Sequence, residues 1–205
     1  MRRIRSGLYF VFLAGILTIA DGCDPRGDCF SATYAFDLNV KAYPDKGSIR
    51  INDSITFSID APTDFINKID GSSINFRDAV NLGSAINFHA LAEDTSWTIK
   101  AVSYFDYILT AGKELRHGFN DGSGNEYLFV EKNGRYRFEL TIVPKRKGLF
   151  IVVFSNAANV YRKKDNCTKA GFTINFKNTD QHYPLSPFYT PGQILVGGDY
   201  YFEVK

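Results

Sequence analysis

The chain has 205 residues and carries 24 lysines and arginines against 22 aspartates and glutamates, a formal net charge of +2. This near balance argues against nucleic-acid binding, because nucleic-acid-binding proteins usually carry a strong basic excess. The length is ordinary for a single all-β domain that follows a short leader.

The first 22 residues have the layout of a secretory signal peptide. A positive segment contains Arg2, Arg3 and Arg5, and the apolar stretch 8–20 follows it. This stretch is shorter than the roughly 20 apolar residues that a transmembrane helix needs. Removal of residues 1–22 takes away three arginines and Asp21, which leaves 21 charges of each sign. We therefore expect an exported and formally neutral protein.

The end of the leader, Ala20-Asp21-Gly22-Cys23, resembles a bacterial lipobox. Gly22 and Cys23 fit this pattern, Ala20 stands where leucine is commoner, and Asp21 departs from it. The resemblance implies that Cys23 becomes the N-terminal residue and carries diacylglycerol and an N-acyl chain such as palmitate, with residues 23–30 as a tether. More than one acyl chain is what stable membrane anchoring requires. The alternative is an ordinary signal-peptide cut near Gly22, with Cys23 as a thiol or disulfide partner.

The lipoprotein interpretation also accounts for the odd number of cysteines. If Cys23 is acylated, Cys29 and Cys167 remain as a disulfide pair. Each of these two cysteines lies just before an alternating segment, and a disulfide needs Cα atoms about 4.4–6.8 Å apart. We therefore expect the first strand to run in the same direction as the strand after Cys167, either beside it or across the sandwich.

We expect no metal site and no cofactor. The spacing between Cys23 and Cys29 is not that of a zinc site, and His89, His117 and His182 lie far apart in the sequence.

The body of the chain shows the period-two alternation of half-buried strands. The apolar positions are Tyr34, Phe36, Leu38, Val40 and Ala42 in segment 33–43, and Ile49, Ile51, Ile55, Phe57 and Ile59 in segment 49–60. Segments 86–90, 136–142, 172–176 and 200–204 show the same pattern, and 149–154 is apolar on both faces like a central covered strand. Asn133-Gly134 between two such segments predicts a tight hairpin.

These strands predict an all-β, immunoglobulin-like antiparallel β-sandwich that occupies residues 31–205 as a single domain. One segment is ambiguous, because Trp97, Ala101, Tyr104, Phe105 and Ile108 fit a helical face nearly as well as a strand. A short helix near 97–110 is therefore an alternative for that segment.

The body is also similar to uncharacterised bacterial exported lipoproteins, through the stretch Ile49-Arg50-Ile51-Asn52-Asp53-Ser54-Ile55. This resemblance implies a family of the bacterial cell envelope without an assigned activity. We expect a lipid anchor at the outer membrane, on its periplasmic side, because no acidic run of the kind that resembles a surface-export signal follows Cys23. Our leading functional hypothesis is a non-catalytic, anchored β-sandwich with a role in interaction or assembly with other envelope proteins.

A second functional hypothesis is a glycan-binding module. Segment 181–192 contains Tyr183, Phe188 and Tyr189 together with several prolines, which deny it regular structure. Its aromatic side chains must cap the core or form a platform for the apolar faces of sugar rings.

We expect no enzymatic activity, because the chain contains no Gly-x-Ser-x-Gly, His-Glu-x-x-His or phosphate-binding glycine loop. Paired carboxylates that only the fold brings together, as in a glycosidase, are not visible in a sequence.

Two basic clusters, 144–148 and 162–164, flank the predicted strand 149–155. A strand of this length separates its ends by roughly 20 Å. We therefore expect the clusters at opposite ends of the domain, where either could contact lipid headgroups or lipopolysaccharide phosphate.

Overall fold

The computed structural model describes residues 33–91, 98–187, 189–191 and 197–205, with the exception of the side chain of residue 166. The chain divides into two compact units, Met1–Ser31 and Ala32–Lys205. All described residues belong to the second unit, which we call the domain.

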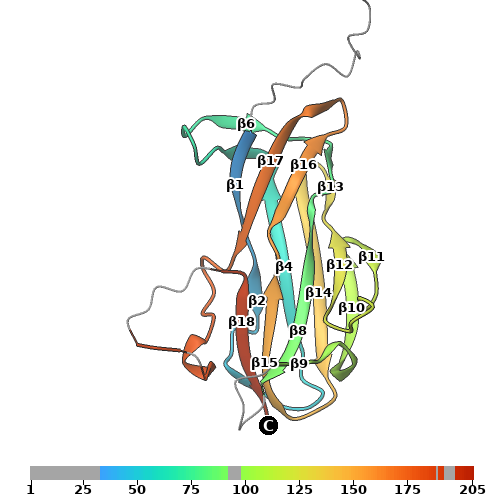
Figure 1. The fold of residues 1–205 in the computed structure, drawn as a ribbon, viewed down its shortest axis with the longest axis vertical. Coiled ribbons are helices and arrows are strands. Elements are labelled where there is room, and N and C mark those ends of the chain that lie inside the picture. Colours follow the sequence, from blue (N-terminus) through green and yellow to red (C-terminus); the bar gives the residue numbers. More distant parts are fainter. Residues whose placement is uncertain (1–32, 92–97, 188, 192–196) are drawn as a thin grey trace, which may run out of the picture. The chain divides into compact units, whose positions relative to one another are not determined.

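The described part of the domain consists of strands and short 3₁₀ turns and contains no α-helix (Figure 1). The elements are β1 (Thr33–Asn39), β2 (Lys41–Tyr43), β3 (Ser48–Ile49), β4 (Ile55–Pro62), β5 (Asp64–Ile66), β6 (Ser73–Asn75), β7 (Ala79–Val80), β8 (Gly83–Leu91), β9 (Thr98–Lys100), η1 (Val102–Tyr104), β10 (Phe105–Ala111), β11 (Lys113–Arg116), β12 (Gly124–Leu128), β13 (Val130–Lys132), β14 (Arg135–Pro144), β15 (Gly148–Phe154), β16 (Ala157–Arg162), β17 (Asp165–Asn175), η2 (Tyr183–Leu185) and β18 (Asp199–Val204). The predicted all-β class is confirmed.

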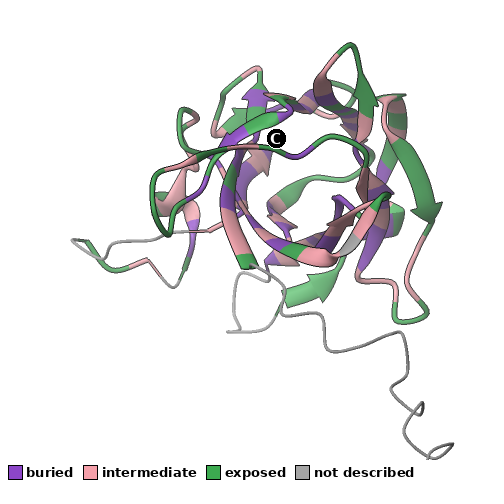
Figure 2. Cartoon of the chain, turned by 90° about the horizontal axis from the view of Figure 1, so that it is seen from above, coloured by how far each residue is buried: buried purple, intermediate pink, exposed green. Residues whose placement is uncertain are grey.

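The strands form three main sheets and one small hairpin. The sheet orders are β1-β17-β16-β7, then β10-β14-β4-β2 with β13 beside β14, and β11-β12-β8-β15-β18-β3 with β9 beside β8, while β5 and β6 form the hairpin. Viewed from above in Figure 2, the sheets curve around a shared interior. The architecture is β-sandwich-like, with mainly antiparallel pairing inside each sheet.

The first strand belongs to two sheets in succession. β1 pairs in parallel with β17, from Thr33 opposite Lys169 to Asn39 opposite Asn175, and β2 then pairs antiparallel with β4. The amide of Val40 donates to the carbonyl of Asn175 at 2.8 Å and marks the crossing point. The expected common direction of the first strand and the strand after Cys167 is confirmed.

One large core joins the three sheets, and aromatic side chains fill much of it. The rings of Phe36, Phe65, Phe76 and Phe172 pack together with centroids 5.1–5.8 Å apart. Such pairs add to the stabilisation that burial of their apolar surface provides. Phe36, Leu38, Val40 and Ala42 are all buried, as the alternation predicts.

The central strand β15 is covered on both faces, as its apolar sequence predicts. Phe150, Val152 and Phe154 point into the core. On the opposite face, Ile151 forms a second cluster with Leu91 and Tyr201.

The predicted continuous strand over 49–60 is wrong. The chain turns at 50–53, where Asn52 has a left-handed φ of 71° and the amide of Arg50 donates to the Asp53 carboxylate at 2.9 Å. Asn and Asp favour such turns because their side chains bond nearby backbone groups. The turn sends β3 to the third sheet and β4 to the second.

The alternative of a short helix near 97–110 is also wrong for the described residues of that segment. They form β9, the single 3₁₀ turn η1 and β10. In β10, Phe105 is buried and Ile108 is 53% exposed, so the segment follows strand alternation and not one helical face. Trp97 lies outside the described residues.

The hairpin predicted at Asn133-Gly134 is confirmed. Both residues have positive φ, 54° and 70°, and Lys132 pairs with Arg135 across the turn. This is the two-residue turn with positive φ at both positions that matches the twist of a hairpin.

Candidate functional site

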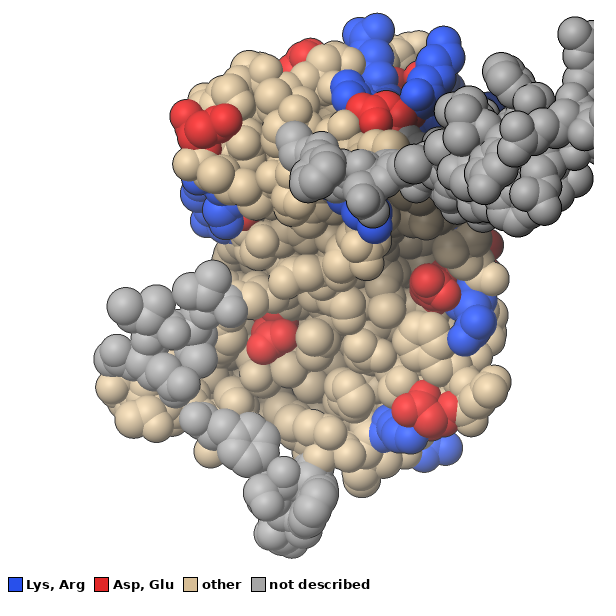
Figure 3. All heavy atoms as spheres, turned by 45° about the horizontal axis from the view of Figure 1, so that its top comes forward, with Lys and Arg blue, Asp and Glu red and all other residues tan. Residues whose placement is uncertain are grey.

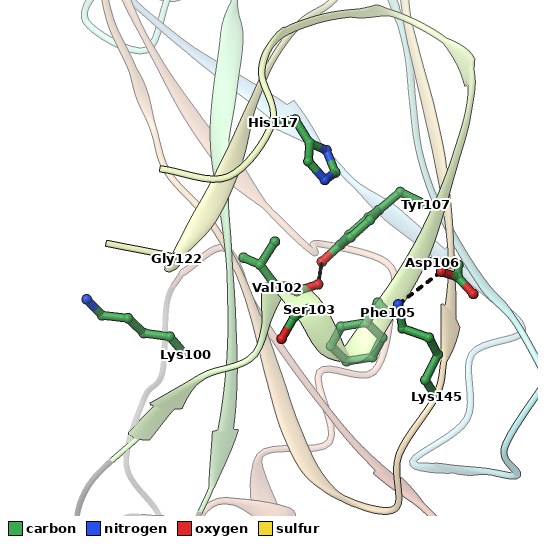
Figure 4. A pocket seen from close by; sticks show the side chains of 9 residues that line it. All are labelled: Lys100, Val102, Ser103, Phe105, Asp106, Tyr107, His117, Gly122 and Lys145. Atoms are coloured by element: carbon green, nitrogen blue, oxygen red, sulfur yellow. Dashed lines mark hydrogen bonds and ion pairs between the residues drawn. The ribbon is translucent and has the colours of Figure 1, made fainter. Parts of the chain in front are cut away.

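An open cleft of about 570 Å³ lies beside β10 (Figure 4). Its lining side chains come from β9, η1, β10, the connection between β11 and β12, and the turn after β14. The lining residues are Lys100, Val102, Ser103, Phe105, Asp106, Tyr107, His117, Gly122 and Lys145.

The turn η1 gives the cleft its fixed shape. The buried Ala101 donates its amide to the carbonyl of Phe88 at 2.9 Å, and the amide of Tyr104 donates to Ala101 at 2.9 Å. The amide of Lys145 then donates to the carbonyl of Tyr104 at 2.8 Å. These bonds join β8, η1 and the end of β14, so the backbone around the cleft is held by three elements.

Tyr107 forms a fixed wall of the cleft. Its hydroxyl donates to the carbonyl of Val102 at 2.8 Å, and its ring lies 5.7 Å from that of His117 (Figure 4). Burial raises the pKa of Tyr107 far above its ordinary value, so the phenol stays protonated at neutral pH. Tyr107 therefore offers an aromatic surface and no titratable base.

Two lysine–carboxylate ion pairs and one histidine–carboxylate contact surround the cleft. Lys145 Nζ lies 3.0 Å from Asp106 Oδ1, Lys100 Nζ lies 3.1 Å from Asp121 Oδ2, and His117 Nδ1 lies 2.8 Å from Glu114 Oε1. Hydrogen bonds from Ser123 and Lys100 lower the pKa of Asp121 to about 2, so this carboxylate stays ionised at neutral pH. The cleft therefore presents donors and acceptors together, without a large excess of one charge.

His89 lies on β8 directly opposite Lys100 in the strand pairing. Its Nδ1 atom is buried without a hydrogen-bond partner, and burial lowers its pKa. We expect a neutral imidazole at this position at neutral pH, beside the lysine that lines the cleft.

The described residues of the aromatic segment 181–192, predicted as a possible sugar-binding platform, do not contribute to the lining of the cleft. Tyr183 lies in η2, packs 5.6 Å from the ring of Tyr201 and joins the cluster on the outer face of β15. Burial raises the pKa of Tyr183 to about 12. Tyr189 is half-buried and donates its amide to Ser186 at 3.1 Å, while Phe188 lies outside the described residues. Tyr183 thus packs mainly against the outer face of the sheet. Sugar binding by these aromatic side chains stays a prediction.

The predicted lipidation and the predicted disulfide involve cysteines that lie mainly outside the described residues. Cys23 and Cys29 lie outside the described residues, and Cys167 lies in β17. Lipidation of Cys23 and the Cys29–Cys167 disulfide therefore stay predictions.

Within the described ranges, no group of three or more potential ligand side chains could hold a metal ion. The same ranges include no helix that is long and apolar enough to span a bilayer.

Sequence reasoning did not find the cleft. Its residues come from segments around 100–107, 117–122 and 145. Of these, Lys145 belongs to a feature that stands out in the sequence, the basic cluster 144–148, and that cluster does not predict a cleft. The tight β9–η1–β10 connection and the β11–β12 connection bring them together, and their local sequences do not predict that contact.

Comparison with known protein families, curated proteins and solved structures finds no match for this chain.

Proposed function

We propose that this chain is a lipid-anchored, non-catalytic binding protein of a bacterial cell envelope, and that the cleft beside β10 takes a polar ligand. The observation that carries the proposal is the placement of the cleft relative to the start of the domain. β1 begins at one end of the domain, and the β9–η1–β10 region lies toward the opposite end (Figure 1).

The pairing of β14 supports this placement. Arg135 at its start pairs with Pro62, next to the β5–β6 hairpin, and Pro144 at its end pairs with Phe105 of the cleft. Ten residues of strand cover roughly 30 Å. A protein anchored through Cys23 would therefore hold the cleft well away from the bilayer.

The chemistry of the cleft favours a ligand rich in hydroxyl groups, such as an envelope glycan. Lys100 and Lys145 supply donors, and Asp106 accepts next to the aromatic wall of Tyr107. Hydroxyl groups donate and accept at once, so they match a rim of paired charges better than a strongly charged ligand does. This supports the glycan-binding hypothesis, at the cleft and not at the aromatic segment 181–192.

The immunoglobulin-like topology also stays a proposal. Its support is the parallel pairing of the first strand with a late strand and the crossing of β1–β2 between sheets. Both are features of immunoglobulin-like domains, where the first strand often divides between the two sheets.

The anchor is tested by mass spectrometry of the mature N-terminus and by membrane fractionation. We expect a diacylglyceryl cysteine at residue 23, and release of the protein from membranes by Cys23→Ser. An unmodified thiol at Cys23 would overturn the anchor.

The ligand class is tested by glycan-array binding of the mature protein. We expect Lys100→Ala and Lys145→Ala to weaken binding about tenfold or more each, because hydrogen bonds from charged donors contribute about 1.5–3 kcal/mol. Lys132→Ala, at the distant 133–134 turn, is the matched control and should bind normally. Loss of binding in Tyr183→Ala alone would assign the site to the aromatic segment.

A further inference from the structure

We infer that the end of the domain at which β1 begins lies directly against an anionic phospholipid bilayer. The surface consists of Ile66, Ile69, Lys163 and Lys164, and we call it the tether-end surface. The inference rests on the anchor in the proposed function, and it assigns that anchored domain one fixed face toward the lipid.

The apolar part of this surface is largely exposed to solvent. Ile66 is 62% exposed and Ile69 is 66% exposed, and both belong to the β5–β6 hairpin. Exposed isoleucines that lie close together in one turn are typical of an interaction site more than of a solvated loop.

This hairpin is fixed to the beginning of the domain. The side chain of Asn67 accepts the amide of Ala35 at 3.1 Å, and the amide of Lys68 donates to the carbonyl of Ala35 at 2.8 Å. Ala35 lies two residues after the start of β1. The isoleucines are therefore held next to the point where the preceding segment 1–32 joins the domain.

The two isoleucines are exposed because side-chain hydrogen bonds fix the turn between β5 and β6. Asn67 is buried, and its Nδ2 donates to Asp70 Oδ1 at 2.8 Å. The hydroxyl and amide of Ser72 also donate to Asp70 Oδ1, at 2.6 and 2.9 Å. These hydrogen bonds to the Asp70 carboxylate fix the turn, with the side chain of Ile69 exposed to solvent.

A basic turn lies at the same end of the domain. Lys163 and Lys164 are exposed between β16 and β17, and Arg162 donates to the carbonyl of Asn75 in β6 at 3.4 Å. Figure 1 places the β16–β17 turn and the β5–β6 hairpin together at this end, and Figure 3 shows lysines and arginines on it with acidic side chains among them. Arg162 is paired with Asp165, whereas Lys163 and Lys164 are exposed to solvent. Basic side chains beside exposed apolar ones match an anionic membrane surface.

The length of the tether is consistent with contact. The tether 23–30 and the two residues that follow it, 31–32, span at most about 35 Å when fully extended, and any less extended path brings the domain closer. A tether this short keeps the tether-end surface within reach of the bilayer that holds the acyl chains.

The test uses the chain from residue 23 with Cys23→Ser and an N-terminal hexahistidine tag, held on vesicles of phosphatidylglycerol and a nickel-chelating lipid. This attachment does not depend on natural acylation, which mass spectrometry tests separately, so either idea can fail alone. Trp97 is the only tryptophan. Trp97→Phe therefore provides a background for Ile69→Trp and, as matched control, for Ile108→Trp, which replaces an isoleucine 53% exposed on β10.

We expect brominated acyl chains to quench the tryptophan at position 69 several times more than the one at position 108. Lys163→Glu combined with Lys164→Glu should reduce the quenching at position 69 and leave the unfolding transition unchanged. Equal quenching at the two positions would overturn the inference. A blue shift at position 69 that depends on protein concentration and not on lipid would assign the surface to a second copy of the chain.

Discussion

Phe36 of β1 and Phe172 of β17 are partners in a parallel strand pair, and their ring centroids lie 5.1 Å apart. The same pairing sets Thr33 opposite Lys169. In the sequence, Cys29 comes four residues before Thr33, and Cys167 comes two residues before Lys169. Both cysteines therefore precede the same end of one parallel pair.

We predict a disulfide between Cys29 and Cys167 on this basis. Chain-entropy reasoning gives a stabilisation of up to about 5 kcal/mol for a loop of this length. Non-reducing peptide mapping should recover the two cysteines in one linked peptide, and reductant should lower the free energy of unfolding in urea. Cys29→Ser should remove the effect of reductant. Free thiols at both positions, or a bond from Cys167 to Cys23, would contradict the prediction.

The alternation of apolar and polar residues predicts the core strands well, because a strand with one buried face needs an apolar side chain at every second position. It fails at Ile51–Ser54, where Asp53 stands at a position that the alternation assigns to an apolar residue. Three consecutive polar residues suit a turn there, and the hydrogen bond from the amide of Arg50 to the Asp53 side chain stabilises it. The β5–β6 hairpin was not predicted, because strands of three residues are too short to show a period.

The cleft could not be predicted for a different reason. Lys100, His117 and Lys145 come together only through the order of β10 and β14 and the path of two connections. A single sequence gives strand positions, but long-range strand order depends on packing between segments far apart in the chain.

We predict that Tyr136→Phe destabilises the domain although it keeps the ring. The buried hydroxyl of Tyr136 donates to the carbonyl of Phe76 at 2.6 Å and accepts the amide of Ala79 at 3.0 Å. Its loss leaves these two backbone groups without that partner, which costs about 1–3 kcal/mol. Urea denaturation measures the change. Tyr43→Phe, at a side chain that is 78% exposed, should change stability little. Equal stability of the two variants would show that the buried hydroxyl contributes nothing.

We predict that Gly134→Ala destabilises the β13–β14 hairpin through its backbone alone. Gly134 has a φ of +70°, and a Cβ there would meet Arg77 only at 3.4 Å, so space is not limiting. A left-handed backbone costs a residue with a Cβ about 1–2 kcal/mol. Thermal unfolding should show a lower transition temperature than the wild type. Gly197→Ala is the matched control, because a Cβ there meets no atom closer than 3.8 Å. Equal losses in both variants would rule out the backbone explanation.

We predict that Asp121 at the rim of the cleft makes the free energy of unfolding depend on pH in the acid range. Its Oδ1 accepts the hydroxyl of Ser123 at 2.7 Å and the amide of Ser123 at 3.0 Å, and Lys100 lies 3.1 Å from Oδ2. These contacts lower the pKa of Asp121 from 3.8 to about 2. A carboxylate with a depressed pKa in the folded state contributes stability above its unfolded pKa, and this contribution is lost as the pH falls through the folded pKa. Asp121→Asn should therefore lower the free energy of unfolding at pH above about 4, and the difference from the wild type should disappear as the pH falls below about 2.

Two further variants separate the cause of this effect. Ser123→Ala removes the hydroxyl donor, so NMR titration should show the pKa of Asp121 moving back toward 3.8. Asp106→Asn removes the other lysine-paired carboxylate at the rim and controls for the simple loss of a surface ion pair. The Ser123→Ala shift is expected in Asp121 alone, because Ser123 donates to that carboxylate. If Ser123→Ala leaves the pKa of Asp121 near 2 and Lys100→Ala raises it, the ion pair holds the carboxylate ionised, and the loop hydrogen bonds do not.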